Sequence, residues 1–171
     1  MSDRCFVDSN IWLYAFMDSS SEKRNRALQV LEAAGVTLST QVINEVCCNL
    51  LRKASYTEAE IRQTIGNFQA RNPILQVTAN VIRQASVLRE SYRFSYWDSL
   101  IIATAIDANC TIVYSEDMQN GLRIGNLIIL NPFAPPVVLP VSEFAVSSVG
   151  WVALFATRKV DQLYGRTTDQ L

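Results

Sequence analysis

Short apolar runs alternate with helical patterns along most of this chain of 171 residues, and this alternation constrains the fold more than any other feature. The apolar runs that fit strands cover residues 5–7, 36–40, 74–77, 110–114 and 127–130. Between them, apolar residues recur at helical spacing over about residues 11–16, 23–34, 42–51, 57–67, 79–90 and 95–106. Strands that alternate with helices predict an α/β fold of three layers, α/β/α, with a mostly parallel central sheet of about four to five strands.

The length of the chain predicts one ordinary domain, because it is too short for two. We expect a regular domain over residues 1–134 and an appended tail over residues 135–171, either helical or facing a partner. Residues 137–156 are apolar but contain Pro140 and Glu143, so a docked segment is favoured over a membrane span. The N-terminal residues lack the apolar run of a secretory signal, which predicts a cytoplasmic protein without a membrane segment.

The chain contains no histidine, which excludes Ser-His-Asp and Cys-His catalysis. Its net charge of −1 provides no global positive field for a polyanion, so any nucleic-acid binding must be local. The four cysteines form no C-x-x-C pair and lie in apolar or helical runs, which predicts reduced core thiols. Any catalysis must therefore use carboxylates, metal ions or lysine.

Four acids fall where the strands of a parallel sheet end or the following helices begin, which is where an open α/β sheet binds its ligands. Asp8 ends the first strand, Glu45 lies in the helix after the second, Asp98 opens a later helix, and Asp117 follows the strand that ends at Tyr114. Each acid also has an ordinary structural interpretation. Asp98 fits a capping box with Ser95, Glu45 fits a solvated helix face, and Asp117 fits a turn.

Asp8 is harder to explain structurally, because an acid between a buried strand and an apolar helix is costly unless something satisfies it. Four converging carboxylates repel one another, and a divalent cation reverses that repulsion. Oxygen ligands without histidine favour Mg²⁺ or Mn²⁺ over zinc.

Four segments of the chain resemble the ordered motifs of PIN-domain nucleases, and more closely those of VapC-type toxins. They are Phe6-Val7-Asp8-Ser9-Asn10, Asn44-Glu45-Val46 with Asn49, Tyr96-Trp97-Asp98-Ser99-Leu100, and Tyr114-Ser115-Glu116-Asp117-Met118. The resemblance covers about residues 5–133. It implies that Asp8, Glu45, Asp98 and Asp117 form a catalytic, metal-binding site. It also implies supporting roles for Asn10, Ser115 and Glu116.

The resemblance implies a metal-dependent ribonuclease, in which the metal ions activate water for an in-line attack on an RNA phosphodiester. It further implies a toxin of a toxin–antitoxin pair, an antitoxin partner and a homodimer. One alternative is a catalytically silent PIN fold that binds RNA or a protein. An aspartyl phosphotransferase ranks last, because it requires a second acid two residues after Asp8, and this chain has Asn10 there.

Overall fold

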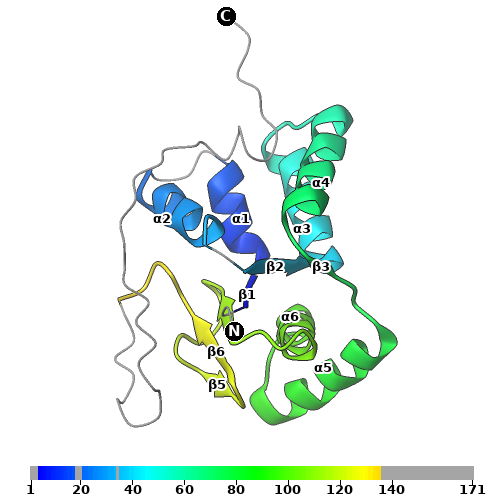
Figure 1. Ribbon diagram of the computed structural model, residues 1–171, viewed down its shortest axis with the longest axis vertical. Coiled ribbons are helices and arrows are strands. Elements are labelled where there is room, and N and C mark those ends of the chain that lie inside the picture. The colour runs from blue at the N-terminus through cyan, green and yellow to red at the C-terminus, as the bar shows by residue number, and fades with distance from the viewer. Residues whose placement is uncertain (1–3, 18–20, 34, 136–171) are drawn as a thin grey trace, which may run out of the picture.

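The central sheet of the computed structural model contains six strands within the residues that the structure describes, which are 4–17, 21–33 and 35–135 (Figure 1). Its elements are β1 Cys5–Val7, α1 Ser9–Phe16, α2 Ser21–Leu31, β2 Val36–Ser39, α3 Thr40–Lys53, α4 Glu58–Arg71, β3 Ile74–Leu75, α5 Ala79–Tyr92, α6 Tyr96–Asp107, β4 Ile112–Tyr114, β5 Arg123–Ile124 and β6 Leu127–Leu130. The strand order is β3-β2-β1-β4-β6-β5, and all neighbouring pairs are parallel except β5 with β6. The expected mostly parallel α/β fold is confirmed.

Helices cover both faces of the sheet and make the three layers that the alternation predicted. In Figure 1, α1, α2, α3 and α4 lie on one side of the strands, and α5 and α6 lie on the other. On the first side α1 packs against α2 and α3, and α3 packs against α4, while α5 packs against α6 on the second side. The neighbouring strands β1 and β2 are therefore buried along their whole length, whereas the edge strands β3 and β5 are only partly buried.

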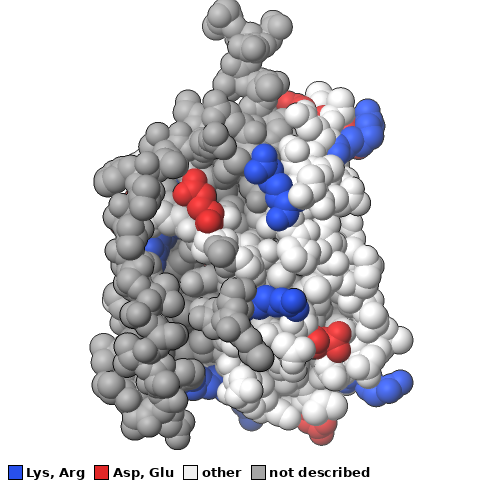
Figure 2. Space-filling model, in the orientation of Figure 1, with Lys and Arg blue, Asp and Glu red and all other residues white. Residues whose placement is uncertain are grey.

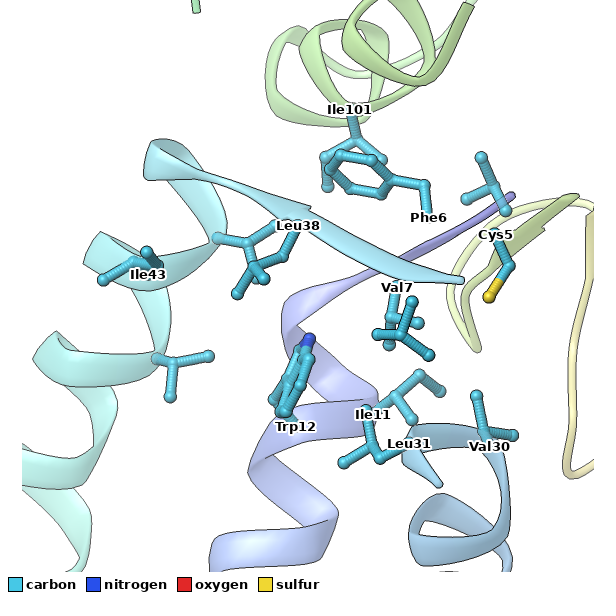
Figure 3. Close-up of a cluster of buried hydrophobic side chains, with 14 of the residues drawn as sticks. Cys5, Phe6, Val7, Ile11, Trp12, Val30, Leu31, Leu38, Ile43 and Ile101 are labelled. Carbon is cyan, nitrogen blue, oxygen red and sulfur yellow. The ribbon is translucent and has the colours of Figure 1, made fainter. Parts of the chain in front are cut away.

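The central strand β1 is anchored from both sides of the sheet (Figure 3). Successive side chains of a strand point to opposite faces, so Phe6 lies on the side of Ile101 in α6 and Val7 lies on the side of Trp12 in α1. All four of these side chains are buried. Because full burial of one large apolar side chain contributes roughly 1.5–3 kcal/mol, this packing fixes the end of β1, where Asp8 follows.

Several elements differ from the expected ones, and β3 and β4 are shorter than the expected runs 74–77 and 110–114. The sequence did not predict β5, a two-residue strand that turns at Gly125 with a φ of 59° and pairs antiparallel with β6. Helix α4 continues to Arg71, because Pro73 disfavours the helical conformation only from Asn72 onward. Helix α2 begins and ends earlier than the expected residues 23–34.

The expected tail lies outside the described residues from position 136 onward, including the apolar stretch at 137–156. Within the described part, no helix is long and apolar enough to cross a membrane. All four cysteines are free thiols, and Cys5, Cys47 and Cys110 are buried as expected. Cys48 is exposed instead, because one step along a helix rotates a side chain by about 100° away from its neighbour.

Candidate acidic site

The candidate site lies where the chain changes direction in the strand order. From β1 the chain builds β2 and β3 on one side, and it then crosses to β4 on the other side of β1. The carboxyl ends of β1 and β4 flank this switch point, which is the usual ligand position in an open α/β sheet. Asp8 directly follows β1, and Ser115 directly follows β4.

Asp8 is buried at this point, with only 5% of its surface exposed, and its carboxylate accepts four hydrogen bonds, one of which, from the Ser9 hydroxyl, is shared with Glu45. Its Oδ1 accepts from the Ser9 backbone N–H at 2.6 Å, which caps the N-terminus of α1. Its Oδ2 accepts from the Ser115 hydroxyl at 2.7 Å and, more weakly, from the Asn10 amide at 3.5 Å. The end of β4 therefore orients the acid that ends β1.

The pKa of the Asp8 carboxyl is raised from its ordinary value of 3.8 to about 6. Burial is the largest cause, because it disfavours the charged form. Hydrogen bonds from Ser115 and Ser9 lower this pKa, and the negative charges of Glu45 and Asp98 raise it. The structure thus brings Glu45 and Asp98 within electrostatic reach of Asp8.

Glu45 reaches the site from the middle of α3 and is linked to Asp8 through one hydroxyl. The Ser9 hydroxyl lies 2.6 Å from Glu45 Oε2 and 3.2 Å from Asp8 Oδ1. A hydroxyl carries one proton and can donate to only one acceptor at a time. The Ser9 hydroxyl can therefore donate to Asp8 or to Glu45 but not to both at once, and an added positive charge would offset the negative charge of the two acids.

Asp98 stands in the first turn of α6 and is half-buried. The Ser95 hydroxyl accepts from the Asp98 backbone N–H at 3.1 Å and caps the helix. The return bond of a capping box, present in α4 between Glu60 and Thr57, does not occur here. No hydrogen bond to the Asp98 carboxylate is found among the described residues, so capping does not occupy this side chain.

Asp117 is exposed and lies in the loop after β4. The Asn10 amide Nδ2 donates to its Oδ2 at 3.1 Å, and the same nitrogen lies 3.5 Å from Asp8 Oδ2. Asn10 therefore bridges the buried acid to the exposed one. With Ser9 on its other side, Asp8 is the common neighbour of the acids that the sequence singled out.

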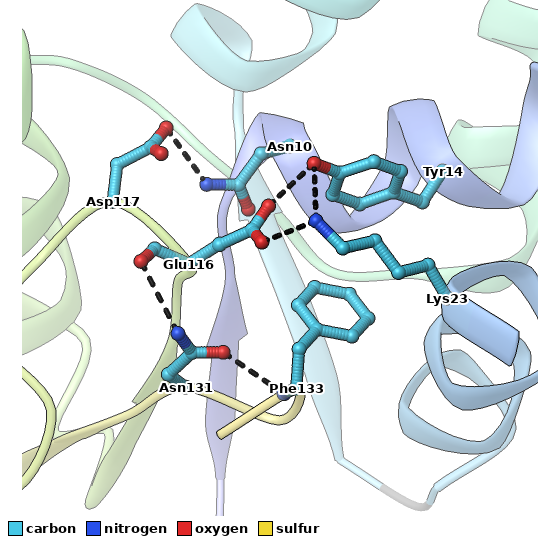
Figure 4. Close-up of polar contacts among 7 residues, drawn as sticks. All are labelled: Asn10, Tyr14, Lys23, Glu116, Asp117, Asn131 and Phe133. Carbon is cyan, nitrogen blue, oxygen red and sulfur yellow. Dashed lines mark hydrogen bonds and ion pairs between the residues drawn. The ribbon is translucent and has the colours of Figure 1, made fainter. Parts of the chain in front are cut away.

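Glu116 belongs to a separate polar cluster with Tyr14 and Lys23, whereas its neighbour Asp117 faces Asn10 (Figure 4). Its carboxylate accepts from the Tyr14 hydroxyl of α1 and from the Lys23 ammonium of α2. The Lys23 ammonium also lies over the rings of Tyr14 and Phe133, 4.6 and 5.4 Å from their centroids. Partial burial raises the pKa of Glu116, but the hydrogen bonds from Lys23 and Tyr14 outweigh it and hold this pKa below its ordinary value.

The atoms of the acidic side chains that could bind a metal ion are all oxygens, which are the ligands that a hard divalent cation prefers. Two further oxygens there, Asn10 Oδ1 and Gln41 Oε1, are buried without a hydrogen-bond partner. Such orphaned acceptors are rare in proteins and require an explanation. In the described residues, however, no three acidic or cysteine side chains stand close enough together to hold a metal ion. The site therefore offers the oxygen ligands that a divalent cation prefers, but in this structure its acidic side chains do not stand close enough together to bind one.

Three contributing residues were not predicted from the sequence. Gln41 Nε2 donates to Glu45 Oε1 at 2.9 Å and to the Trp97 carbonyl at 3.3 Å, and its spacing of four residues from Glu45 on a helix was a usable signal. Tyr14 and Lys23 hold Glu116 through contacts across 102 and 93 positions, for which the sequence offers no local signal.

On the face drawn in Figure 2, the acidic and basic side chains of the described residues are scattered and form no continuous patch of one sign. This distribution agrees with the net charge of −1. Local groups must therefore supply any attraction for a polyanion.

Comparisons with known proteins identify similar folds. The family model described as PIN domain matches residues 5–120. A toxin–antitoxin complex from Klebsiella pneumoniae aligns with a TM-score of 0.59 and 19% identity over 75% of this chain and 98% of that one. VapBC2 from Rickettsia felis, bound to a DNA fragment from its promoter, aligns with a TM-score of 0.54 and 19% identity, over 73% of this chain and 96% of that one. Mycobacterium tuberculosis VapC20, a toxin that cleaves the sarcin–ricin loop, aligns with a TM-score of 0.52 and 17% identity, over 64% of this chain and 86% of that one. No curated protein matches the sequence.

Proposed function

We propose that this chain, which belongs to the PIN domain family because the family model matches residues 5–120, is a metal-dependent endoribonuclease that hydrolyses RNA phosphodiester bonds. The observation that carries the proposal is the environment of Asp8. Its carboxyl is almost fully buried, its pKa is raised to about 6, and hydroxyl and amide groups link it to two other acids. Strongly perturbed carboxyls at a ligand-binding edge are typical of functional sites.

PIN nucleases generally use divalent metal ions, and we propose Mg²⁺ or Mn²⁺ for this chain. Asp8, Glu45, Asp98 and Asp117 would hold the ion, with the orphaned Asn10 Oδ1 as a further oxygen. A bound ion would supply positive charge that offsets the acids, polarises the phosphodiester and makes water more acidic. Among the described residues, no hydrogen bond holds the Asp98 carboxylate away from Asp8, and the Asp117 carboxylate accepts from the same Asn10 amide that faces Asp8.

The surrounding residues would perform three tasks in this site. Ser115 and the Ser9 backbone N–H hold the Asp8 carboxylate in one orientation, and Gln41 does the same for Glu45. The Ser9 hydroxyl lies between Asp8 and Glu45, so it can donate its hydrogen bond to either carboxylate. The Lys23–Glu116–Tyr14 cluster ties the loop after β4 to α1 and α2, which positions Asp117 next to it in sequence.

The test is cleavage of mixed RNA by the full chain, with and without Mg²⁺ or Mn²⁺. We expect Asp8→Asn and Asp98→Asn to lose at least about 100-fold in rate, because even groups that only orient metal ligands contribute 10- to 100-fold. Asp107→Asn is the matched control, since Asp107 is an exposed acid at the opposite end of the same helix as Asp98. Cleavage that persists in EDTA and in both site variants would refute the metal mechanism.

A silent PIN fold that binds RNA or a protein is the second candidate. The observation that favours it is that no three acids in the described part stand close enough to hold a metal ion. Binding of RNA without cleavage in either metal, by wild type and Asp8→Asn alike, would establish this second function.

We also propose that the chain is the toxin of a toxin–antitoxin pair, binds an antitoxin protein, forms a homodimer and acts on RNA in the cytoplasm. The support is the fold, which it shares with the toxin–antitoxin complex from Klebsiella pneumoniae and with VapBC2. Sedimentation of the purified chain tests the dimer. Growth arrest on expression, absent with Asp8→Asn, tests the toxin.

A further inference from the structure

Two aromatic side chains at the start of α6 are exposed directly beside the candidate acidic site. Tyr96 is 48% exposed and Trp97 is 59% exposed, although tryptophan is highly buried on average. Trp97 immediately precedes Asp98 in the chain, so their Cα atoms are about 3.8 Å apart. A large apolar surface is thus kept in solvent next to one of the proposed metal-binding acids.

The structure holds this aromatic pair, Tyr96 and Trp97, in a defined arrangement. The two rings meet edge to face, with centroids 5.1 Å apart and an interplanar angle of 86°. The Arg89 guanidinium lies 4.8 Å from the Tyr96 ring centroid and also donates to the Ser99 hydroxyl at 2.9 Å. These contacts restrict the rings while leaving more than half of the Trp97 surface exposed.

Gln41 connects Trp97 to the acids through its side-chain amide. Its Nε2 donates both to the Trp97 carbonyl, at 3.3 Å, and to Glu45 Oε1, at 2.9 Å. The backbone of the aromatic pair is therefore fixed relative to Glu45 on α3 as well as to Asp98 on α6.

An unpaired nucleobase fits this surface better than a second protein surface does. Single-stranded nucleic acids bind by stacking bases on exposed aromatic rings, with cationic groups near the backbone. Arg89 supplies a positive charge beside Tyr96, and the exposed Arg93 follows on the loop into α6. The core of a protein interface is depleted of charged residues, whereas the half-buried Asp98 carboxylate adjoins Trp97.

We propose that Trp97, held edge to face by Tyr96, stacks an unpaired base of single-stranded RNA beside Asp98 and so positions the neighbouring phosphodiester at the acids. This inference rests on the proposed ribonuclease function and deepens it by assigning a residue that positions the substrate. It makes Trp97 a substrate-positioning residue. Double-stranded RNA, whose bases are stacked within the helix, would not use this surface.

The experiment measures binding of a short fluorescent single-stranded RNA to the full chain in an Asp8→Asn background with Mg²⁺. Trp97→Ala is expected to weaken binding by about 5- to 150-fold, which is the range for removing one base–aromatic stack. Trp97→Phe should recover part of this loss, because a ring is retained. Val87→Ala is the matched control, since Val87 is 60% exposed and apolar but lies on α5.

A set of RNAs with one abasic nucleotide at successive positions separates stacking from a structural role. With Trp97 present, one abasic position should weaken binding more than the others, and this difference should vanish in Trp97→Ala. Such coupling is the signature of a direct contact in a double-mutant cycle. In cleavage assays with Asp8 intact, Trp97→Ala should raise KM while kcat stays within a few-fold.

Equal RNA affinity with and without the Trp97 indole would overturn the proposal. So would a Trp97→Ala variant that sediments as a smaller species but binds RNA normally, because Trp97 would then be an interface residue. The ribonuclease function fails separately, if wild type does not cut RNA in Mg²⁺ or Mn²⁺. The abasic binding cycle requires no cleavage, so the two failures are distinguishable.

Discussion

Replacement of Asp8 by asparagine should make the metal-free protein more stable above about pH 6, because the native fold keeps a strained charge at this position. The pKa of Asp8 rises from 3.8 to about 6 on folding, mainly through burial. Since a tenfold change in a proton equilibrium corresponds to 1.36 kcal/mol, this rise corresponds to about 3 kcal/mol against the ionised native form. Asp8 is 5% exposed, so solvent screens little of this cost.

The sign follows from proton binding. Native Asp8 keeps its proton up to about pH 6, whereas the unfolded chain releases it near 3.8. The native state therefore binds more protons in this window, and the free energy of unfolding falls as pH rises through it. Asp8→Asn abolishes this titration, and its amide still accepts from the Ser9 N–H and donates to the Ser115 hydroxyl.

Urea unfolding in EDTA measures the effect at several pH values. We expect the free energy of unfolding of Asp8→Asn, minus that of wild type, to increase by about 2–3 kcal/mol between pH 4 and pH 8, as linkage gives for this pKa difference. Glu90→Gln, at an exposed acid of α5, is the control and should give a nearly constant difference. A constant difference for Asp8→Asn too would refute the reasoning. Added Mg²⁺ or Mn²⁺ should stabilise wild type but not Asp8→Asn.

Three further substitutions test individual contacts, each by urea unfolding at pH 7 in EDTA. Ser115→Ala removes the buried donor to Asp8 and should cost about 1.5–3 kcal/mol, as expected for a hydrogen bond to a charged group. Phe68→Ala should cost about 3–5 kcal/mol, because this fully buried ring packs edge to face on Trp12 at 4.9 Å. Asn10→Asp replaces the amide donor between two acids by a carboxylate and should cost about 1–3 kcal/mol.

Exposed positions provide the controls for these substitutions. Ser91→Ala and Asn126→Asp change the same residue types at exposed sites, and Trp97→Ala removes an exposed ring, so each should stay within about 0.5 kcal/mol of wild type. Equal effects at a buried position and its control would show that the contact does not contribute. For Asn10→Asp, a loss that Mn²⁺ does not reduce would contradict the assignment of this residue to the cation site.

The fold was largely predictable, because its periodicities are local. A helix was expected over residues 95–106, and the residues from Ser99 to Ala105 of α6 are buried throughout. Thr57 and Glu60 form the capping box of α4, which is a local sequence pattern. The strand β5 was not predictable, because two residues carry no period and the pairing depends on a turn at Gly125.

The placement of the acids was predictable to the level of the sheet edge, and their individual contacts were not. The rule that parallel strands end at one edge brings Asp8 and the loop after β4 together. It does not state that Glu116 turns toward Lys23 while its neighbour Asp117 turns toward Asn10. These directions depend on partners far away in the sequence, and no local pattern encodes them.

Asn10 explains how the proposed cation site and the stability of the fold can depend on the same groups. Its amide nitrogen donates toward Asp8 and Asp117, while its Oδ1 is buried without a partner. An aspartate at this position would add a further negative charge and remove the only side-chain donor that reaches both acids in the described part of the chain. An asparagine keeps the acids together at lower repulsion and still provides an oxygen ligand. Asn10, which is the residue that disfavours an aspartyl phosphotransferase, is thus well suited to a cation site built from acids.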